Sequence, residues 1–273
     1  MIHGLGNEYL YAVTRLLCIC RKGSEVRTYF GTGFFIDKEH KPYLITNRHV
    51  AEPSYNDASY DGFVLESIIL HNRKYNPDTH KVDLEECKIV EWKLVLPNDL
   101  NDDVACFFDL QGTTPFSVTC YIPFTFLAPK EIFETEISVC DFIAFIGFPA
   151  VYDHKNNLPI LRTGTISSDP RLDYSYSEAK DIGHVIAYEA FSKHGSSGSP
   201  VFALQKGFRV GGAISTCDGF YRKVYLIGIN AGSVTQTVKL KDDLKYDEHQ
   251  QLSYMYKSYI IITLIEEAEE NWK

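Results

Sequence analysis

Apolar residues occur along the chain in short runs separated by turns, and this pattern predicts a protein built mostly of β-strands. Runs of β-branched and aromatic residues bounded by Gly, Pro, Asn and Asp are typical of strands. In the first part of the chain we expect strands at Leu10–Cys20, Arg27–Ile36, Tyr43–Asn47, Gly62–His71, Cys87–Leu96 and Asp103–Asp109. In the second part we expect them at Ile137–Phe148, Leu161–Ser168, His184–Phe191, Pro200–Ala203, Val210–Cys217 and Tyr225–Asn230. Two sets of about six strands favour a pair of small barrels over one parallel sheet.

Helical periodicity is visible in one segment, Ser258–Trp272. Its apolar residues recur at three- and four-residue spacing, which is the repeat of one helix face, and glutamates occupy the other face. The apolar positions are Ile261, Leu264, Ile265 and Ala268. We expect a closing surface helix that packs this face against the strands.

Polar segments between the runs predict loops, at Asp153–Asn157, Asp173–Asp181 and Lys239–Gln251. The segment Gln111–Lys130 contains three prolines and is typical of a connector between two modules. The predicted fold class is therefore all-β, with two six-stranded antiparallel β-barrels and a C-terminal helix. We expect residues 1–112 to form the first barrel, and residues 113–273 to comprise the connector, the second barrel and the helix.

Acidic residues outnumber basic ones. With 36 Asp and Glu against 27 Lys and Arg, the 273-residue chain has a formal net charge of −9 at pH 7. Such a charge repels phosphate backbones and anionic lipid head groups, so we expect neither nucleic acid nor a membrane as a partner. The apolar runs also fall short of the roughly 18 to 20 residues that a helix needs to span a bilayer.

Cysteine usage indicates a reducing environment. The chain has 7 cysteines, an odd number, and no CxxC pair, which argues against a disulfide framework and against a zinc site. The N-terminal sequence lacks a basic leader followed by an apolar run and a small-residue cleavage site, so we expect mature sequence there. These features predict a soluble cytoplasmic protein without a bound metal.

The segment with the strongest chemical signal is the turn Gly195–Ser199. Two glycines flank Ser196 and Ser197, Pro200 ends the turn, and β-prone apolar residues on both sides argue against a flexible linker. Such a turn can push the Ser197 hydroxyl outward. It can also aim the N–H groups of Gly195 and Ser197 at one point, as an oxyanion hole requires.

A serine hydroxyl needs a neighbouring base, and His49 is the best placed histidine. It follows two predicted strands whose hairpin would deliver the imidazole just past the end of the second strand. The imidazole also needs a carboxylate that fixes its tautomer and stabilises the imidazolium. Asp103 opens an apolar strand, where we expect it to be partly buried. Asp102 is the rival, and we expect it on the solvated side of the loop.

The order His49, Asp103, Ser197, together with the motifs around these residues, resembles the chymotrypsin-like serine peptidases. The motifs are GTGFFI before TNRHV, DVA at Asp103, IGFP leading to RTGTIS, GSSGSPVF at the serine, and LIGINAG after it. The bacterial branch is the most similar, with its glutamyl endopeptidases and HtrA-type proteases. The resemblance runs from about residue 30 to residue 232.

This resemblance implies two six-stranded barrels of the chymotrypsin-like type, with the site in the cleft between them. It implies a serine endopeptidase that forms an acyl-enzyme on Ser197, with His49 as base, Asp103 orienting His49, and the Gly195 and Ser197 N–H groups as oxyanion hole. No cofactor is required. The implied partner is a polypeptide substrate. We also expect narrow specificity or an activating protein partner, because an unrestrained cytoplasmic protease would be hazardous. Two alternatives stay open: an idle protease-like adaptor that binds peptides, and an esterase.

The resemblance also places a substrate pocket beside the serine, lined by Phe191, Ser192, His194, Asn230, Ala231 and Gly232. Phe191 occupies the position at which trypsin-like enzymes carry an aspartate, and Asn230 the position at which glutamyl endopeptidases carry a histidine. Cleavage after uncharged residues is therefore expected, while Ser192, His184 and His194 leave an acidic preference open. Ser196 replaces the aspartate that pairs with a newly cut N-terminus in digestive proteases, so the oxyanion turn must be ordered by other means.

Overall fold

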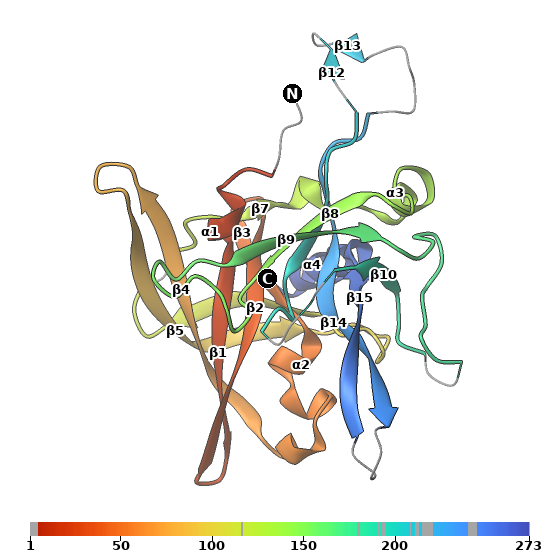
Figure 1. The fold of residues 1–273 in the computed structure, drawn as a ribbon. Helices are drawn as coiled ribbons and strands as arrows, with labels where there is room; N and C mark the ends of the chain where they lie inside the picture. Colours follow the sequence, from red (N-terminus) through yellow and green to blue (C-terminus); the bar gives the residue numbers. More distant parts are fainter. Residues whose placement is uncertain are drawn as a thin grey trace.

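A computed structural model describes residues 5–115, 117–178, 181–190, 192, 195–207, 209–210, 213–214, 221–239 and 245–272. The chain forms two β-structures that lie side by side, one red to yellow and the other green to blue in Figure 1. This arrangement confirms the predicted all-β class. Among the described residues, no helix is long and apolar enough to cross a membrane.

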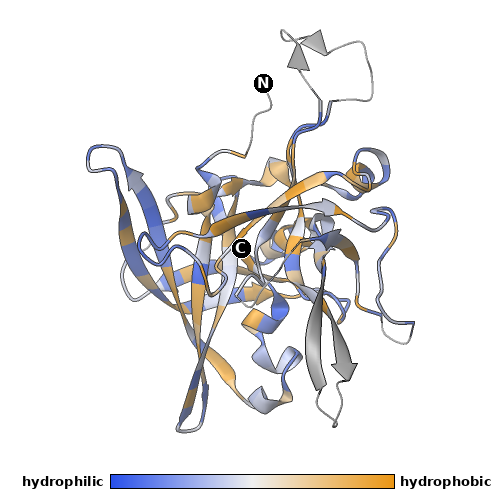
Figure 2. Cartoon of the chain, in the orientation of Figure 1, coloured by the Kyte–Doolittle hydropathy of each residue, from blue (hydrophilic) through white to orange (hydrophobic). Residues whose placement is uncertain are grey.

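The first β-structure is a sheet in the order β1-β4-β5-β6-β3-β2-β7, and an additional pairing of β1 with β2 closes its first six strands into a ring. Its strands are β1 (Val13–Lys22), β2 (Glu25–Lys38), β3 (Lys41–Thr46), β4 (Val64–Asn76), β5 (Lys81–Val95), β6 (Ala105–Gly112) and β7 (Ile122–Pro123). Side chains alternate between the two faces of a strand, and in β1 Leu16, Cys18 and Cys20 are accordingly buried. The end of the β4–β5 hairpin is hydrophilic, as Figure 2 shows.

The second β-structure is a closed barrel in the order β10-β15-β14-β11-β8-β9. Its strands are β8 (Phe142–Gly147), β9 (Ile160–Ile166), β10 (Val185–Glu189), β11 (Pro200–Ala203), β14 (Tyr225–Lys239) and β15 (Lys245–Lys257). The expected loop over Lys239–Gln251 is wrong at the residues that the structure describes, because β14 continues to Lys239 and β15 begins at Lys245 and pairs with it; residues 240–244 lie outside the described residues. Backbone pairing between these two strands extends into a polar sequence that carried no apolar alternation.

Helix α4 (Ser258–Asn271) confirms the predicted closing helix. The four predicted face residues, Ile261, Leu264, Ile265 and Ala268, are at most 1% exposed. They belong to a hydrophobic core that also contains Tyr43 and Phe108 of the first sheet and Leu226 and Ile229 of the second barrel. The helix therefore packs against both halves of the molecule.

Short helical segments fill the connections. They are α1 (Tyr9–Ala12), α2 (Arg48–Ala51), η1 (Pro53–Tyr55), η2 (Ala58–Tyr60), η3 (Phe124–Phe126) and α3 (Lys130–Thr135). The predicted strand at Leu10 begins instead with α1, and β1 starts at Val13. Within the predicted strand Val210–Cys217, the structure describes Val210 at the end of β12 (Arg209–Val210) and the two residues of β13 (Ala213–Ile214); residues 211–212 and 215–217 lie outside the described residues.

The segment between the two β-structures is tied to the first of them. Strand β7, which lies within the predicted connector Gln111–Lys130, pairs in parallel with β2 at Ile36 and Asp37. The division of the chain at residue 112 stays a prediction.

Candidate active site

His49 and Asp103 are held against each other at the end of two neighbouring strands. His49 lies in α2, directly after β3, and Asp103 precedes β6, which pairs with β3. His49 Nδ1 lies 2.6 Å from Asp103 Oδ2, and the His49 backbone N–H donates to Asp103 Oδ1 at 2.8 Å. Asn47 Nδ2 donates to the Asp103 carbonyl at 2.6 Å, which fixes the aspartate backbone.

This geometry determines the tautomer of the histidine. A carboxylate can only accept hydrogen bonds, so His49 Nδ1 carries the proton and Nε2 is left with its lone pair. The Asp103 side chain is 6% exposed and that of His49 is 23% exposed, so the carboxylate is shielded while the imidazole reaches solvent. This is the arrangement of a general base with its orienting group.

The serine turn requires glycine at two positions. Gly195 and Gly198 have φ angles of +91° and +88°, in the left-handed region that favours glycine. A Cβ atom at Gly195 would lie 2.3 Å from the Phe148 carbonyl oxygen, and one at Gly198 would lie 1.9 Å from the Thr32 carbonyl oxygen. The turn is thus pressed against the first sheet at Thr32 and against the end of β8.

Thr32 of β2 connects this turn to the first sheet. Its backbone N–H donates to the Ser197 carbonyl at 2.9 Å, and its Oγ1 donates to the Gly195 carbonyl at 2.6 Å. Thr32 Oγ1 also accepts the Phe148 N–H at 3.1 Å, and the Thr32 carbonyl accepts Thr46 Oγ1 at 2.7 Å. Thr46 ends β3, three residues before His49, so Thr32 and Thr46 connect the serine turn to the histidine segment.

The second barrel fixes the turn from the opposite side. Asn230 Nδ2 donates to the Ser196 carbonyl at 2.7 Å, and the Gly198 N–H donates to the Asn230 carbonyl at 2.9 Å. These bonds and those of Thr32 order the turn without the aspartate that Ser196 replaces.

The turn presents one hydroxyl and two free amides. Ser197 Oγ donates to the Ala231 carbonyl at 3.2 Å, whereas the hydroxyl of Ser199 is fully buried and has no partner among the described residues. No described residue accepts a hydrogen bond from the N–H group of Gly195 or Ser197, although the carbonyls of both residues are hydrogen-bonded. Two amides with no acceptor, one of them on the hydroxyl-bearing residue, can stabilise a developing oxyanion.

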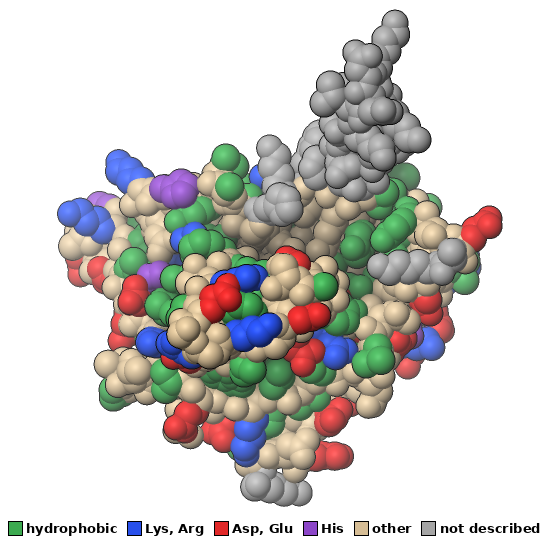
Figure 3. All heavy atoms as spheres, turned by 90° about the horizontal axis from the view of Figure 1, so that it is seen from below, with side chains coloured by type: hydrophobic (Ala, Val, Ile, Leu, Met, Phe, Trp, Pro, Cys, Tyr) green, Lys and Arg blue, Asp and Glu red, His purple; other side chains and the backbone are tan. Residues whose placement is uncertain are grey.

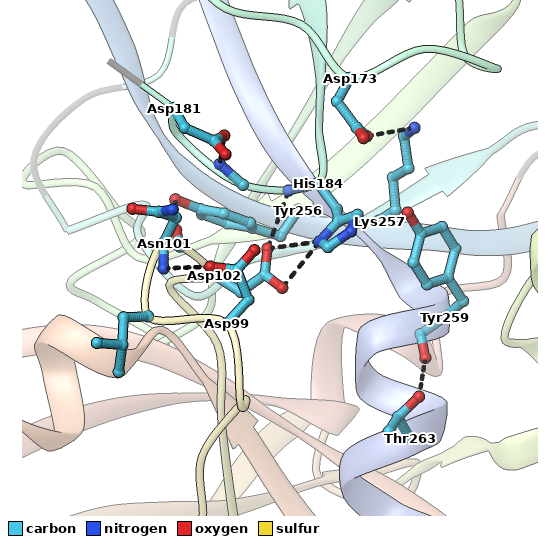
Figure 4. Close-up of polar contacts among 12 residues, drawn as sticks. Asp99, Asn101, Asp102, Asp173, Asp181, His184, Tyr256, Lys257, Tyr259 and Thr263 are labelled. Atoms are coloured by element: carbon cyan, nitrogen blue, oxygen red, sulfur yellow. Dashed lines mark hydrogen bonds and ion pairs between the residues drawn. The ribbon is translucent and has the colours of Figure 1, made fainter.

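Asp102 is not solvated, contrary to the expectation from the sequence. It is 3% exposed, and its carboxylate accepts the His184 backbone N–H at 2.9 Å and lies 3.0 Å from His184 Nδ1 (Figure 4). His184 precedes β10, so this pair joins the two β-structures next to Asp103. Burial raises the pKa of Asp102, and the hydrogen bonds and charge of His184 oppose that shift. The burial of Asp102 is explained by a partner 82 residues away in the sequence.

Among the described residues, one group of side chains could hold a metal ion. The ligand atoms of Asp99, Asp102 and His184 lie within 4.8 Å of one another. His184 Nδ1 already faces the Asp102 carboxylate (Figure 4). The same loop is also linked to β15, because the Tyr256 hydroxyl donates to the Asn101 carbonyl at 3.0 Å. We therefore interpret this group as part of the contact between the barrels.

Several of the predicted pocket residues are engaged with one another. Asn230 is fully buried, and its side chain accepts a hydrogen bond from Tyr188 and donates to Ser192 Oγ at 3.0 Å. Ala231 is 8% exposed, and Gly232 follows it on β14. Phe191 and His194 lie outside the described residues. Asn230 acts here as a structural link between the pocket and the turn, a role that the sequence did not indicate.

Thr32 and Thr46 also build the site, a role that the sequence did not directly indicate. Both stand within motifs that had been identified, GTGFFI and TNRHV, but only as parts of strands. The signal that could have found them is a threonine in an otherwise apolar strand, because a buried hydroxyl needs a hydrogen-bond partner.

The chain is similar to a known protein family and to solved structures. The family model of the trypsin-like peptidase domain matches residues 31–211. The fold is similar to that of protease Anisep from Arthrobacter nicotinovorans, with a TM-score of 0.52, 12% identity and 93% of each chain covered. It is also similar to that of the thermostable serine protease AL20 from an extremophilic microorganism, with a TM-score of 0.50, 12% identity, and 92% of this chain and 93% of that one covered. No curated protein matches the sequence.

Proposed function

The chain belongs to the trypsin-like peptidase domain family and is a serine endopeptidase, and we propose that it cleaves peptide bonds through an acyl-enzyme formed on Ser197. The observation that carries this proposal is the His49 Nδ1 to Asp103 Oδ2 contact of 2.6 Å, joined through Thr46 and Thr32 to the serine turn. A base of fixed tautomer, a nucleophile and two free amides then belong to one hydrogen-bonded unit.

The proposed reaction has two halves. Ser197 Oγ attacks the scissile carbonyl while His49 Nε2 takes its proton, and the Gly195 and Ser197 N–H groups stabilise the oxyanion. His49 returns the proton to the leaving amine as the C–N bond breaks. Water then attacks the acyl-enzyme with His49 again as base, and the carboxylic acid and the free serine are regenerated. The carboxylate of Asp103 stays ionised throughout and stabilises the imidazolium.

The test of the proposed function is labelling by a fluorophosphonate, which reacts only with an activated serine. We expect the probe to attach at Ser197, and peptide mapping of the labelled protein checks the position. His49→Ala should abolish labelling, because the serine loses its base, whereas His80→Ala, an exposed histidine on the β4–β5 hairpin, serves as control. A protein that binds peptides but is not labelled would support the adaptor alternative.

The proposed function extends to the branch of the family, the cellular compartment and the partners of the enzyme. We place the enzyme in the bacterial branch of the family and in the cytoplasm, with a polypeptide substrate and neither nucleic acid nor a membrane as partner. The cysteine content supports a reducing compartment: Cys18 and Cys106 are buried thiols, and burial raises the pKa of both. Narrow specificity, or an activating protein partner, would restrain such an enzyme.

The residue before the cut is expected to be uncharged. A buried network of neutral side chains forms this part of the pocket, in which Asn230 is hydrogen-bonded to both Tyr188 and Ser192. The network contains no carboxylate that could pair with a Lys or Arg side chain of the substrate. An unpaired substrate cation there would cost several kcal/mol. Cleavage of a peptide library, with sequencing of the products and Ser197→Ala as control, checks this. A library in which Lys or Arg dominates the position before the cut would contradict it.

A further inference from the structure

A second pocket lies directly beside the serine turn, on the side of the first sheet. It has a volume of about 500 Å³ and is lined by Arg15 of β1, Phe30 of β2, Phe148, Tyr152 and Gly195, among others. Gly195 is the residue whose amide is available to the oxyanion, so the pocket adjoins the reacting carbonyl. None of the described lining residues comes from β14.

The position of the pocket relative to Ser197 indicates which side of the scissile bond it serves. Ser197 Oγ contacts the carbonyl of Ala231 on β14, and an extended substrate can pair with that strand through its residues before the cut. The pocket lies beyond Gly195 and is built from β1, β2 and the segment after β8. It is therefore open to the first residues after the cut, which leave with the amine.

Arg15 gives this pocket its chemical character. Its guanidinium carbon lies 3.8 Å from the centre of the Phe30 ring and 5.1 Å from that of Tyr152, and Nη1 donates to the Tyr152 hydroxyl at 3.3 Å. The group is thus held in place by two aromatic rings. No carboxylate within the described part of the chain pairs with it, and most of its five N–H donors remain free to bind a ligand.

The guanidinium of Arg73 adds a second positive charge next to this pocket, against the Phe148 ring that lines it. Arg73 of β4 is 1% exposed and donates to the carbonyls of Val13 and Asn157, and its guanidinium carbon lies 4.8 Å from the centre of the Phe148 ring. Burial lowers the pKa of Arg73 to about 10, so it keeps its charge at neutral pH. Here too no described carboxylate forms an ion pair.

This local charge contrasts with the rest of the protein. The chain carries a net charge of −9, and acidic and basic side chains lie interspersed over the face shown in Figure 3. Two arginines that pair with no described carboxylate therefore form, beside an apolar pocket, a local site for an anion on a molecule whose net charge repels anions. A planar guanidinium held by aromatic rings is well suited to bind a carboxylate with two hydrogen bonds.

We propose that the Arg15 pocket binds a carboxylate of the substrate within the first two residues after the cut, and so selects peptides with an acidic leaving segment. The inference rests on the proposed function of the adjoining site. The carboxylate can come from an Asp or Glu side chain or from the C-terminus of a short substrate. Both sources present the same group to Arg15.

The test compares peptides that are identical up to the cut and carry Glu, Gln or Lys at the first or second position after it. A further pair ends two residues after the cut, with either a free carboxylate or an amide. We expect kcat/KM to be about 10-fold higher for Glu than for Gln at one of the two positions, and lowest for Lys, because a hydrogen bond to a charged group is worth more than a neutral one. The preference should decrease with added salt.

Arg15→Met removes the guanidinium and keeps an apolar stem, and it should reduce the Glu to Gln ratio to about 1. Arg21→Met is the matched control, since Arg21 lies on the same strand and pairs with the exposed Glu66. Both substitutions remove one positive charge. This control should retain the full ratio. An equal rate for Glu and Gln in the wild type, or an unchanged ratio in Arg15→Met, would overturn the proposal.

A binding measurement separates this inference from the proposed function. The peptide amides Ala-Glu-NH2 and Ala-Gln-NH2, together with Ala-Ala and Ala-Ala-NH2, are titrated into Ser197→Ala protein and followed by NMR chemical shifts. If the wild type cleaves nothing but the carboxylate peptides bind about 10-fold more tightly and depend on Arg15, the proposed function fails and the pocket assignment stands. If cleavage occurs without any carboxylate preference in either measurement, the assignment fails alone.

Discussion

Ser197→Ala should reduce kcat on a cleavable peptide by about 10⁴- to 10⁶-fold, because the nucleophile and its base act as a unit. The fold should be unaffected, since among the described residues Ser197 Oγ makes one hydrogen bond, to the Ala231 carbonyl. The bonds that order the turn involve its backbone groups and the side chains of Thr32 and Asn230, which the variant keeps. Steady-state kinetics and thermal unfolding of the purified variant, side by side with the wild type, provide the measurement.

Ser199→Ala is the matched control, two positions further along the same turn. Its hydroxyl is buried without a partner among the described residues, so its removal should leave kcat within a few-fold of the wild type. If Ser199→Ala abolished cleavage while Ser197→Ala retained it, the assignment of the nucleophile would be wrong.

Asp103→Asn should lower kcat by about 10⁴-fold at neutral pH. The amide would present its NH2 or its carbonyl to His49 Nδ1, and the fixed tautomer that the 2.6 Å contact now imposes would be lost together with the stabilisation of the imidazolium. Asparagine has nearly the same size and shape as the Asp103 side chain that it replaces. The variant should therefore show a much lower kcat with little change in melting temperature.

Asp102→Asn tests the same loop at the neighbouring carboxylate. Because Asp102 faces His184 and not His49, the variant should keep kcat within about 10-fold, and lose about 1 to 3 kcal/mol of stability by weakening the contact between the barrels. Kinetics and denaturant unfolding of the pair check this. The reverse result, a larger loss of kcat in Asp102→Asn than in Asp103→Asn, would exchange the roles of the two aspartates.

The elements that the sequence predicted best are those whose signal is local. The spacing of Ile261, Leu264, Ile265 and Ala268 predicted helix α4 because one face of a helix repeats every three to four residues, and all four are buried. His49 and Asp103 could be predicted as partners because each stands at the end of an apolar strand, and adjacent strand ends bring such residues together.

Features that depend on distant partners were not visible in the sequence. Asp102 follows a polar loop, and nothing near it indicates that His184 will cover it. The polar stretch from Lys239 to Gln251 lacks apolar alternation, yet Lys239 of β14 and residues 245–249 of β15 take part in backbone pairing between the two strands. Arg73 is an ordinary arginine in a strand of mixed polarity, and its burial follows only from the packing of β4 against the segment after β8.

Helix α4 and the residue after it join the two β-structures late in the chain. Trp272 packs on Tyr43 and Phe108, with ring centres 5.3 Å apart in each case, and Glu269 pairs with Lys38 at 2.6 Å. The ribosome makes this helix after every strand of both barrels, and β15, which completes the second barrel, comes immediately before it. A nascent chain that already carries His49, Asp103 and Ser197 still lacks the segment that holds its two halves together. We therefore expect the two β-structures to reach their final arrangement only after α4 has been made.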